Sequence, residues 1–242
     1  GRSAGPPGDV DGDGYDDLVV GAYYDNSVAG SAYIVSGPVT GDMNLGSADA
    51  TISGGTSGDY LGWWTEGVGD VDSDGYDDVL VSAPGSSDFV GGAGEVLLYL
   101  GPLSGGLTMA DATARLYGTA NGDWTGGGLS AAGDFDGDGH ADLIISGELR
   151  DYAGTNDGVV YVIHGPVSGD VDLSAADVTF VGEAAGDQLG WWDDGGGDVN
   201  DDGYDDLVWG CPEGFTLDGF DGGGIVFVHY GGPGGLPANP DW

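Results

Sequence analysis

The sequence from residue 8 to residue 24 reads GDVDGDGYDDLVVGAYY, and three closely related stretches follow it. They are GDVDSDGYDDVLVSAPG at 69–85, GDFDGDGHADLIISGEL at 133–149 and GDVNDDGYDDLVWGCPE at 197–213. Their starting points are 61, 64 and 64 residues apart. A block that recurs at a fixed period with the same internal order indicates one supersecondary unit repeated along the chain. We therefore interpret the chain as four repeats, 1–61, 62–125, 126–189 and 190–242, of which the last is truncated.

Each repeat contains four short runs rich in Val, Ile, Leu and Tyr, separated by Gly, Asp, Asn and Pro. The first runs begin near residues 1, 61, 126 and 189, and the second runs span 18–21, 79–82, 143–146 and 207–210. The third runs begin at 32, 95, 159 and 225, and the fourth at 50, 112 and 177, with a shortened partner at 240–242. Such runs, without a sustained helical period, are typical of β-strands. They predict an all-β fold: a single β-propeller domain over 1–242, built from four blades of four antiparallel strands each.

The acidic stretch of each repeat predicts a cation-binding hairpin loop between the first two strands of a blade. Acids or amides fall at loop positions one, three, five and nine, and a glycine at position six permits the tight turn. Position seven offers its backbone carbonyl, and all-oxygen coordination suits calcium better than zinc or copper. We therefore expect one calcium ion per repeat, about four in all. The predicted ligands are Asp9, Asp11, Asp13, Tyr15 and Asp17; Asp70, Asp72, Asp74, Tyr76 and Asp78; Asp134, Asp136, Asp138, His140 and Asp142; and Asp198, Asn200, Asp202, Tyr204 and Asp206.

Two departures refine this ligand set. Ala141 stands at loop position eight, where the other loops have Asp, which indicates that position eight is not a ligand. Asn200 keeps an oxygen at position three but removes one negative charge, so the fourth site is expected to be the weakest. The loop is not an EF-hand, because position twelve lies inside an apolar strand rather than carrying the Glu that an EF-hand requires.

The composition excludes several classes of partner. The formal net charge is -39, with three Arg, no Lys and 42 acidic residues, so nucleic acid and anionic membrane surfaces are poor partners. Cys211 is the only cysteine, which rules out an intramolecular disulfide and leaves bound metal as the means of cross-linking the fold. No stretch approaches the ~20 apolar residues of a membrane-spanning helix, and no signal peptide is recognisable.

At these residues the chain resembles the FG-GAP repeat family, which includes the blades of the integrin α-subunit propeller and of many bacterial secreted proteins. The apolar strand and GAP-like turn after the Asp loop are present as LVVGAY at 18–23, VLVSAP at 79–84 and LVWGCP at 207–212. The FG half is present as LGWW at 61–64 and 189–192. The resemblance implies a propeller with calcium in the hairpins, an extracellular or cell-surface location and a role in adhesion. Family propellers typically have seven blades, so four repeats leave open whether another chain completes the ring.

Two tryptophan pairs, Trp63 with Trp64 and Trp191 with Trp192, occupy equivalent places in the second and fourth repeats. In one interpretation they form an aromatic platform for a sugar or a protein partner. In the other they are structural, with bulky and small residues alternating where the innermost strands converge.

The leading functional hypothesis is an extracellular, non-enzymatic binding or adhesion module that recognises a protein or glycan ligand. The alternative is a self-assembling structural protein of an extracellular filament or surface layer, in which a second copy completes the truncated last repeat. A weaker alternative is a carbohydrate-active enzyme or lectin. The sequence contains no GxSxG motif and no evident Ser/His/Asp order to support an enzyme.

Overall fold

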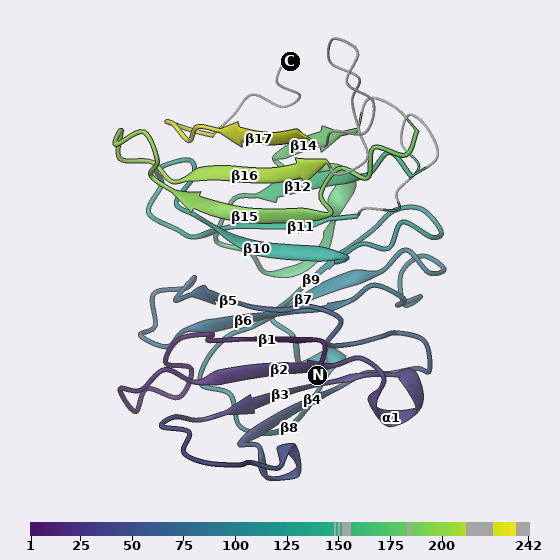
Figure 1. Ribbon diagram of the computed structural model, residues 1–242, viewed down its shortest axis with the longest axis vertical. Coiled ribbons are helices and arrows are strands. Elements are labelled where there is room, and N and C mark those ends of the chain that lie inside the picture. The colour runs from purple at the N-terminus through teal and green to yellow at the C-terminus, as the bar shows by residue number, and fades with distance from the viewer. Residues whose placement is uncertain (148, 150, 152–155, 183–184, 212–224, 236–242) are drawn as a thin grey trace.

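The computed structural model describes residues 1–147, 149, 151, 156–182, 185–211 and 225–235. These residues form four β-sheets; in Figure 1 the first sheet lies lowest and the second above it, while the third and fourth overlap in the upper half of the view. Within each sheet, consecutive strands of one repeat pair antiparallel. The protein is therefore all-β, and its several antiparallel sheets are consistent with propeller blades.

The strands divide among the sheets as follows. The first sheet contains β1 (Ser3–Gly5), β2 (Leu18–Ala22), β3 (Ser31–Val35) and β4 (Ala50–Ser53). The second contains β5 (Thr65–Gly69), β6 (Asp78–Ala83), β7 (Glu95–Tyr99) and β9 (Ala114–Tyr117). The third contains β10 (Gly128–Gly133), β11 (Asp142–Ser146), β12 (Val159–Ile163) and β14 (Val178–Val181), and the fourth contains β15 (Trp192–Gly197), β16 (Asp206–Cys211) and β17 (Ile225–His229).

Helical structure is limited to single turns in the connections. They are α1 (Asp25–Val28), which contains three residues with positive φ, and the 3-10 turns η1 (Leu45–Ser47), η2 (Met109–Asp111) and η3 (Leu173–Ala175). The predicted second and third strands lie where the sequence placed them. The first strands begin later than predicted, at Thr65, Gly128 and Trp192, because the residues before them form turns. The shortened strand predicted at 240–242 lies outside the described residues.

The prediction of four strands per sheet was wrong for the first two sheets, which have five strands each. Strand β8 (Gly105–Thr108) leaves the second repeat and pairs parallel with β4. Strand β13 (Gly169–Asp172) leaves the third repeat and pairs parallel with β9. Both strands are short, glycine-containing and largely exposed, so they lack the apolar pattern of a core strand. They cover backbone groups at a sheet edge that would otherwise be open to pairing with another chain.

The apolar core lies between the sheets in three clusters, one at each junction. Strand β6 shows why: all six of its residues are buried, with Val79 and Val81 packed toward the first sheet and Leu80 toward the third. The leading strands β1, β5, β10 and β15 contact one another in succession. Because every leading strand is followed by an Asp-rich loop, this stacking brings the four loops to the same end of the sheets, along the left side of Figure 1.

Candidate functional site: the acidic loops and the opposite aromatic face

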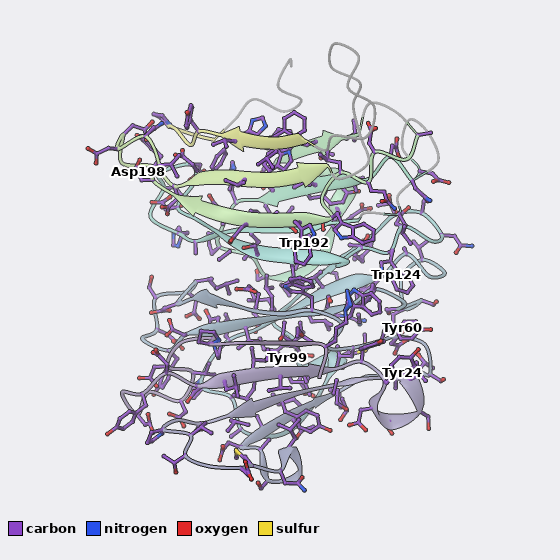
Figure 2. The ribbon with its side chains drawn as sticks, viewed as in Figure 1. Tyr24, Tyr60, Tyr99, Trp124, Trp192 and Asp198 are labelled. Carbon is purple, nitrogen blue, oxygen red and sulfur yellow. The ribbon has the colours of Figure 1, made fainter. Side chains whose placement is uncertain are left out.

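The four acidic loops connect β1 to β2, β5 to β6, β10 to β11 and β15 to β16. The glycine at position six has a positive φ in each, 90° at Gly14, 97° at Gly75, 91° at Gly139 and 94° at Gly203. Glycine adopts this positive-φ conformation more readily than other residues, as expected for the tight turn predicted at position six. In Figure 2, Asp198 marks the loop of the fourth sheet, at the end of the molecule opposite Tyr24, Tyr60 and Trp124.

The carboxylate at position one organises each loop. In the first loop, Asp9 Oδ1 accepts hydrogen bonds from the N–H groups of Gly12 (2.8 Å) and Asp13 (3.0 Å), and its Oδ2 accepts one from Gly14 (2.8 Å). The bond from the position-six glycine recurs in the other loops at 2.9, 3.1 and 2.8 Å. The four loops therefore fold in the same way, with their carboxylates turned inward.

Three groups of carboxylates have ligand oxygens within 4.8 Å of one another. They are Asp9, Asp11 and Asp13; Asp70, Asp72 and Asp78; and Asp134, Asp136 and Asp142. Within the described part of the chain, the other predicted carboxylate ligands do not join such a group; they are Asp17, Asp74, Asp138, Asp198, Asp202 and Asp206. In the fourth loop the Nδ2 of Asn200 donates to Asp202 Oδ2 at 2.9 Å, so an amide competes for one of the carboxylates.

The carboxylate at position nine also ties its loop to the sheet. Asp78 is fully buried, and its two oxygens accept hydrogen bonds from the N–H groups of Val71 (2.8 Å) and Gly101 (2.8 Å), the latter just after β7. Asp17, Asp142 and Asp206 make the equivalent pair of bonds. Burial raises the pKa of Asp78 to about 6, although the two N–H groups lower it, and repulsion from Asp72 and Asp70 adds to the rise. A divalent cation beside these carboxylates would lower the pKa again.

The donor set fits a hard divalent cation. Every side-chain donor in the three groups is a carboxylate oxygen, the type of ligand that calcium prefers. In the third loop, Asp134 Oδ1 is buried and has no hydrogen-bond partner within the described residues, whereas Asp9 Oδ1 has two. An orphaned carboxylate oxygen is costly in a protein interior and is readily satisfied by a cation.

An aromatic cluster occupies the opposite end of the sheets. Tyr23 lies 4.8 Å from Trp63 between ring centroids, and Trp63 lies 5.4 Å from Trp124 in an edge-to-face arrangement. Tyr60 contacts both tryptophans, and Tyr24 adds an exposed ring that is 68% accessible (Figure 2). The guanidinium of Arg2, one of three arginines in the chain, stacks on Trp63 at 3.6 Å from the ring centroid. We refer to Tyr23, Tyr24, Tyr60, Trp63 and Trp124 as the aromatic cluster.

The second tryptophans of the two pairs contact each other. The ring of Trp64 in the second repeat lies 5.9 Å from the ring of Trp192 in the fourth repeat, measured between centroids, although the third repeat lies between them in the sequence. The intervening repeat has Gly128 at the equivalent position, and a Cβ there would come within 2.5 Å of Asp193. Bulky and small residues thus alternate along the leading strands. Trp192 nonetheless remains 63% exposed.

A pocket of about 270 Å³ lies between the leading strands β5, β10 and β15. Its polar lining side chains are Glu66, Ser130, Asp194 and Asp205, and the remaining lining residues are Ala or Gly. Burial, and then repulsion from Asp194, raises the pKa of Glu66. The hydroxyl of Ser130 lies 3.2 Å from Asp194 and donates to it. Glu66 and Asp194 belong to different repeats and to no shared motif, so no pattern in the sequence marks them.

Comparison with known proteins supports the repeat interpretation. A family model described as FG-GAP repeat matches residues 2–35, 62–99 and 126–163. Integrin alpha pat-2 of Caenorhabditis briggsae is 29% identical over 222 residues, and the protein of the same name from Caenorhabditis elegans is 29% identical over 220 residues. Each alignment covers 84% of this chain but only 17% of the relative. Among the described residues, no helix has the length and apolar character needed to cross a membrane.

Proposed function

We propose, because three stretches of this chain match the FG-GAP repeat, that its four sheets are the blades of a calcium-stabilised propeller that acts as a non-enzymatic, extracellular binding or adhesion module. The observation that carries this proposal is the separation of the two ends. Acidic loops gather at one end of the sheets, while the other end carries the aromatic cluster, in which Tyr24 is exposed and the other four rings are partly buried. One end then stabilises the fold and the other remains available to a partner.

Calcium would be held by the carboxylates at positions one, three, five and nine and by the carbonyl at position seven. When bound, the ion neutralises carboxylates that otherwise repel one another. Asp78 and its equivalents already connect each loop to the end of the third strand through two N–H groups. A cation at the loop would therefore stabilise the hairpin and the adjoining turn together. The fourth site should be the weakest, because Asn200 replaces a carboxylate and donates to Asp202.

The aromatic cluster is the surface that we assign to ligand contact. Aromatic rings with polar tips provide large contact areas for saccharide faces and for protein partners. The relatives that align over most of this chain are named integrin alpha, which favours a role in adhesion.

A matched pair of tyrosine variants tests this assignment. Tyr24 at the aromatic end is 68% exposed, and Tyr15 at the acidic end is 55% exposed. We expect Tyr24→Ala and Trp124→Ala to weaken binding to a glycan array or to a panel of immobilised extracellular-matrix proteins, while Tyr15→Ala has no effect. Equal losses in all three variants, or no binding of the parent protein to any probe, would refute the assignment.

A second candidate function, self-assembly, is favoured by the outer face of the fourth sheet. Val226 and Val228 of β17 are 68% and 47% exposed, and Tyr230 beyond them is 56% exposed. A second copy would remove these side chains from water. Light scattering coupled to size exclusion distinguishes the two functions. A calcium-dependent oligomer that Val226→Asp with Val228→Asp dissolves supports assembly, and a monomer at all calcium concentrations excludes it.

A further inference from the structure

The residue at loop position eight, which is not a predicted ligand, contacts the loop of the preceding sheet. Asp77 Oδ2 accepts a hydrogen bond from the N–H of Asp9 at 2.7 Å, and the N–H of Asp77 donates to the carbonyl of Asp9 at 3.1 Å. The same two bonds join Asp205 to Asp134, at 2.8 and 3.3 Å. Asp77 and Asp205 therefore bind both the backbone N–H and the backbone carbonyl of the first predicted ligand in a neighbouring loop.

The residue before each of these acids completes the contact. The ring of Tyr76 lies over Gly12, where a Cβ would come within 2.6 Å of the ring. The ring of Tyr204 lies over Gly137 in the same way, and a Cβ at Gly137 would come within 2.2 Å of that ring. Because both glycines have positive φ and a ring against them, no larger residue fits there without displacement. The first and third loops thus receive a Tyr-Asp pair, and the second and fourth loops supply it.

The contact is absent at the junction between the second and third loops. There the third loop has His140 and Ala141 in place of Tyr and Asp, and the second loop has Ser73 in place of the receiving glycine. Within the described residues, Gly69 at the start of the second loop has open space where Gly8 of the first loop meets Asp77. The four loops are therefore joined as two pairs, first with second and third with fourth.

We propose that Asp77 and Asp205 are positioning residues that couple the cation sites in these two pairs, so that binding in one loop of a pair strengthens binding in the other. This inference rests on the proposed calcium sites. Asp77 precedes Asp78, a predicted ligand of the second loop, and fixes Asp9, a predicted ligand of the first. Ordering either loop therefore orders the other. Ala141 removes the connection between the pairs.

Each loop carries its own reporter for a calcium titration of the whole chain. The position-six glycines Gly14, Gly75, Gly139 and Gly203 all donate to the position-one carboxylate, at 2.8, 2.9, 3.1 and 2.8 Å. Their amide resonances in a two-dimensional ¹H–¹⁵N NMR spectrum give four separate affinities. Outer-shell partners of metal ligands change affinity by about 10–100-fold. We expect Asp77→Ala to weaken binding at Gly14 by about tenfold and to leave Gly139 and Gly203 unchanged.

Three further variants make the test specific. Asp205→Ala should weaken binding at Gly139 and leave Gly14 unchanged. Asp77→Asn keeps an acceptor for the N–H of Asp9 but removes the charge, so it should restore most of the affinity. Asp16→Ala is the matched control, since Asp16 stands at the same loop position but is exposed. It should change nothing at the other three loops.

Several results would overturn the proposal. They are an unchanged affinity at Gly14 in Asp77→Ala, an equal loss at all four loops, or an Asp77→Asn variant as weak as the Ala variant, which would indicate a charge effect. A failure of the calcium sites themselves gives a different result, because none of the four glycines would then respond to calcium in the parent protein.

Discussion

Replacing Asp78 with Ala should destabilise the protein even in the absence of calcium, because this predicted ligand is also a structural acceptor. It is fully buried and accepts the N–H groups of Val71 and Gly101, both at 2.8 Å. A buried donor left unsatisfied costs about 1–3 kcal/mol, so the two together cost roughly 2–6 kcal/mol. Part of this is offset, since burial disfavours the ionised carboxylate and raises its pKa to about 6.

The net loss that we expect is about 3 kcal/mol, which for a chain of this size lowers Tm by roughly 6–12 °C. Thermal unfolding followed by tryptophan fluorescence in excess chelator measures it. The matched control is Asp72→Ala, which removes an exposed predicted ligand of the same loop whose Oδ1 accepts only a 3.2 Å bond from Asp74. That variant should unfold within about 0.5 kcal/mol of the parent in chelator. Equal Tm values for the two variants would refute the dual role of Asp78.

Three other predictions concern the cation and two buried acids. Calcium at ~100 times its Kd should stabilise the protein by about 2.7 kcal/mol for each occupied site, and chelator should reverse this; no calcium dependence of Tm would contradict it. Glu66→Gln should raise Tm at pH 7 but not at pH 4. The folded protein raises the pKa of Glu66, so the neutral carboxyl favours folding at low pH and this contribution is lost as the carboxyl ionises at higher pH. A Tm difference between variant and parent that does not change with pH would be contrary evidence. Arg115→Ala should lower the free energy of urea unfolding by about 3–5 kcal/mol, because Arg115 lies 2.6 Å from the buried Glu95 and 2.7 Å from Asp88. Arg115→Lys should recover part of this stability. A loss below about 1 kcal/mol in the Ala variant would argue against a stabilising ion pair between Arg115 and Glu95.

Much of the fold could be predicted from the sequence, because the repeats state the same local information four times. The second strands follow the acidic loops as apolar runs, and β6 and β11 occupy the predicted residues to within one position at each end. The turn at each position-six glycine was also predictable, since only glycine readily adopts its positive φ. Strands β8 and β13 could not be predicted, because their pairing with the preceding sheet depends on a contact between repeats rather than on an apolar pattern.

Some of the many Asp residues are neither predicted calcium ligands nor exposed to solvent. Asp59 is buried and accepts hydrogen bonds from the backbone and hydroxyl of Thr56, closing the turn before β5. Asp123 is buried and accepts the N–H groups of Thr119 and Ala120 in the equivalent turn. The short Asp side chain reaches nearby backbone donors, which the longer Glu reaches less well. Composition alone could not separate these turn-forming acids from the ligands.

Loop position eight shows where sequence reasoning stops. In the sequence, Ala141 indicates that position eight is not a ligand, and none of the three carboxylate groups includes this position. The consequence of Ala141 for the neighbouring loop is visible only in the structure. Asp77 and Asp205 bind the loop of another repeat, about 70 residues away in the sequence, and Ala141 has no carboxylate to do so. A repeat compared with itself shows which residues each unit shares. The differences between units determine which loops contact each other. One junction has Ala141 and Ser73, whereas each of the other two has a Tyr-Asp pair packed on the loop that contains the glycine.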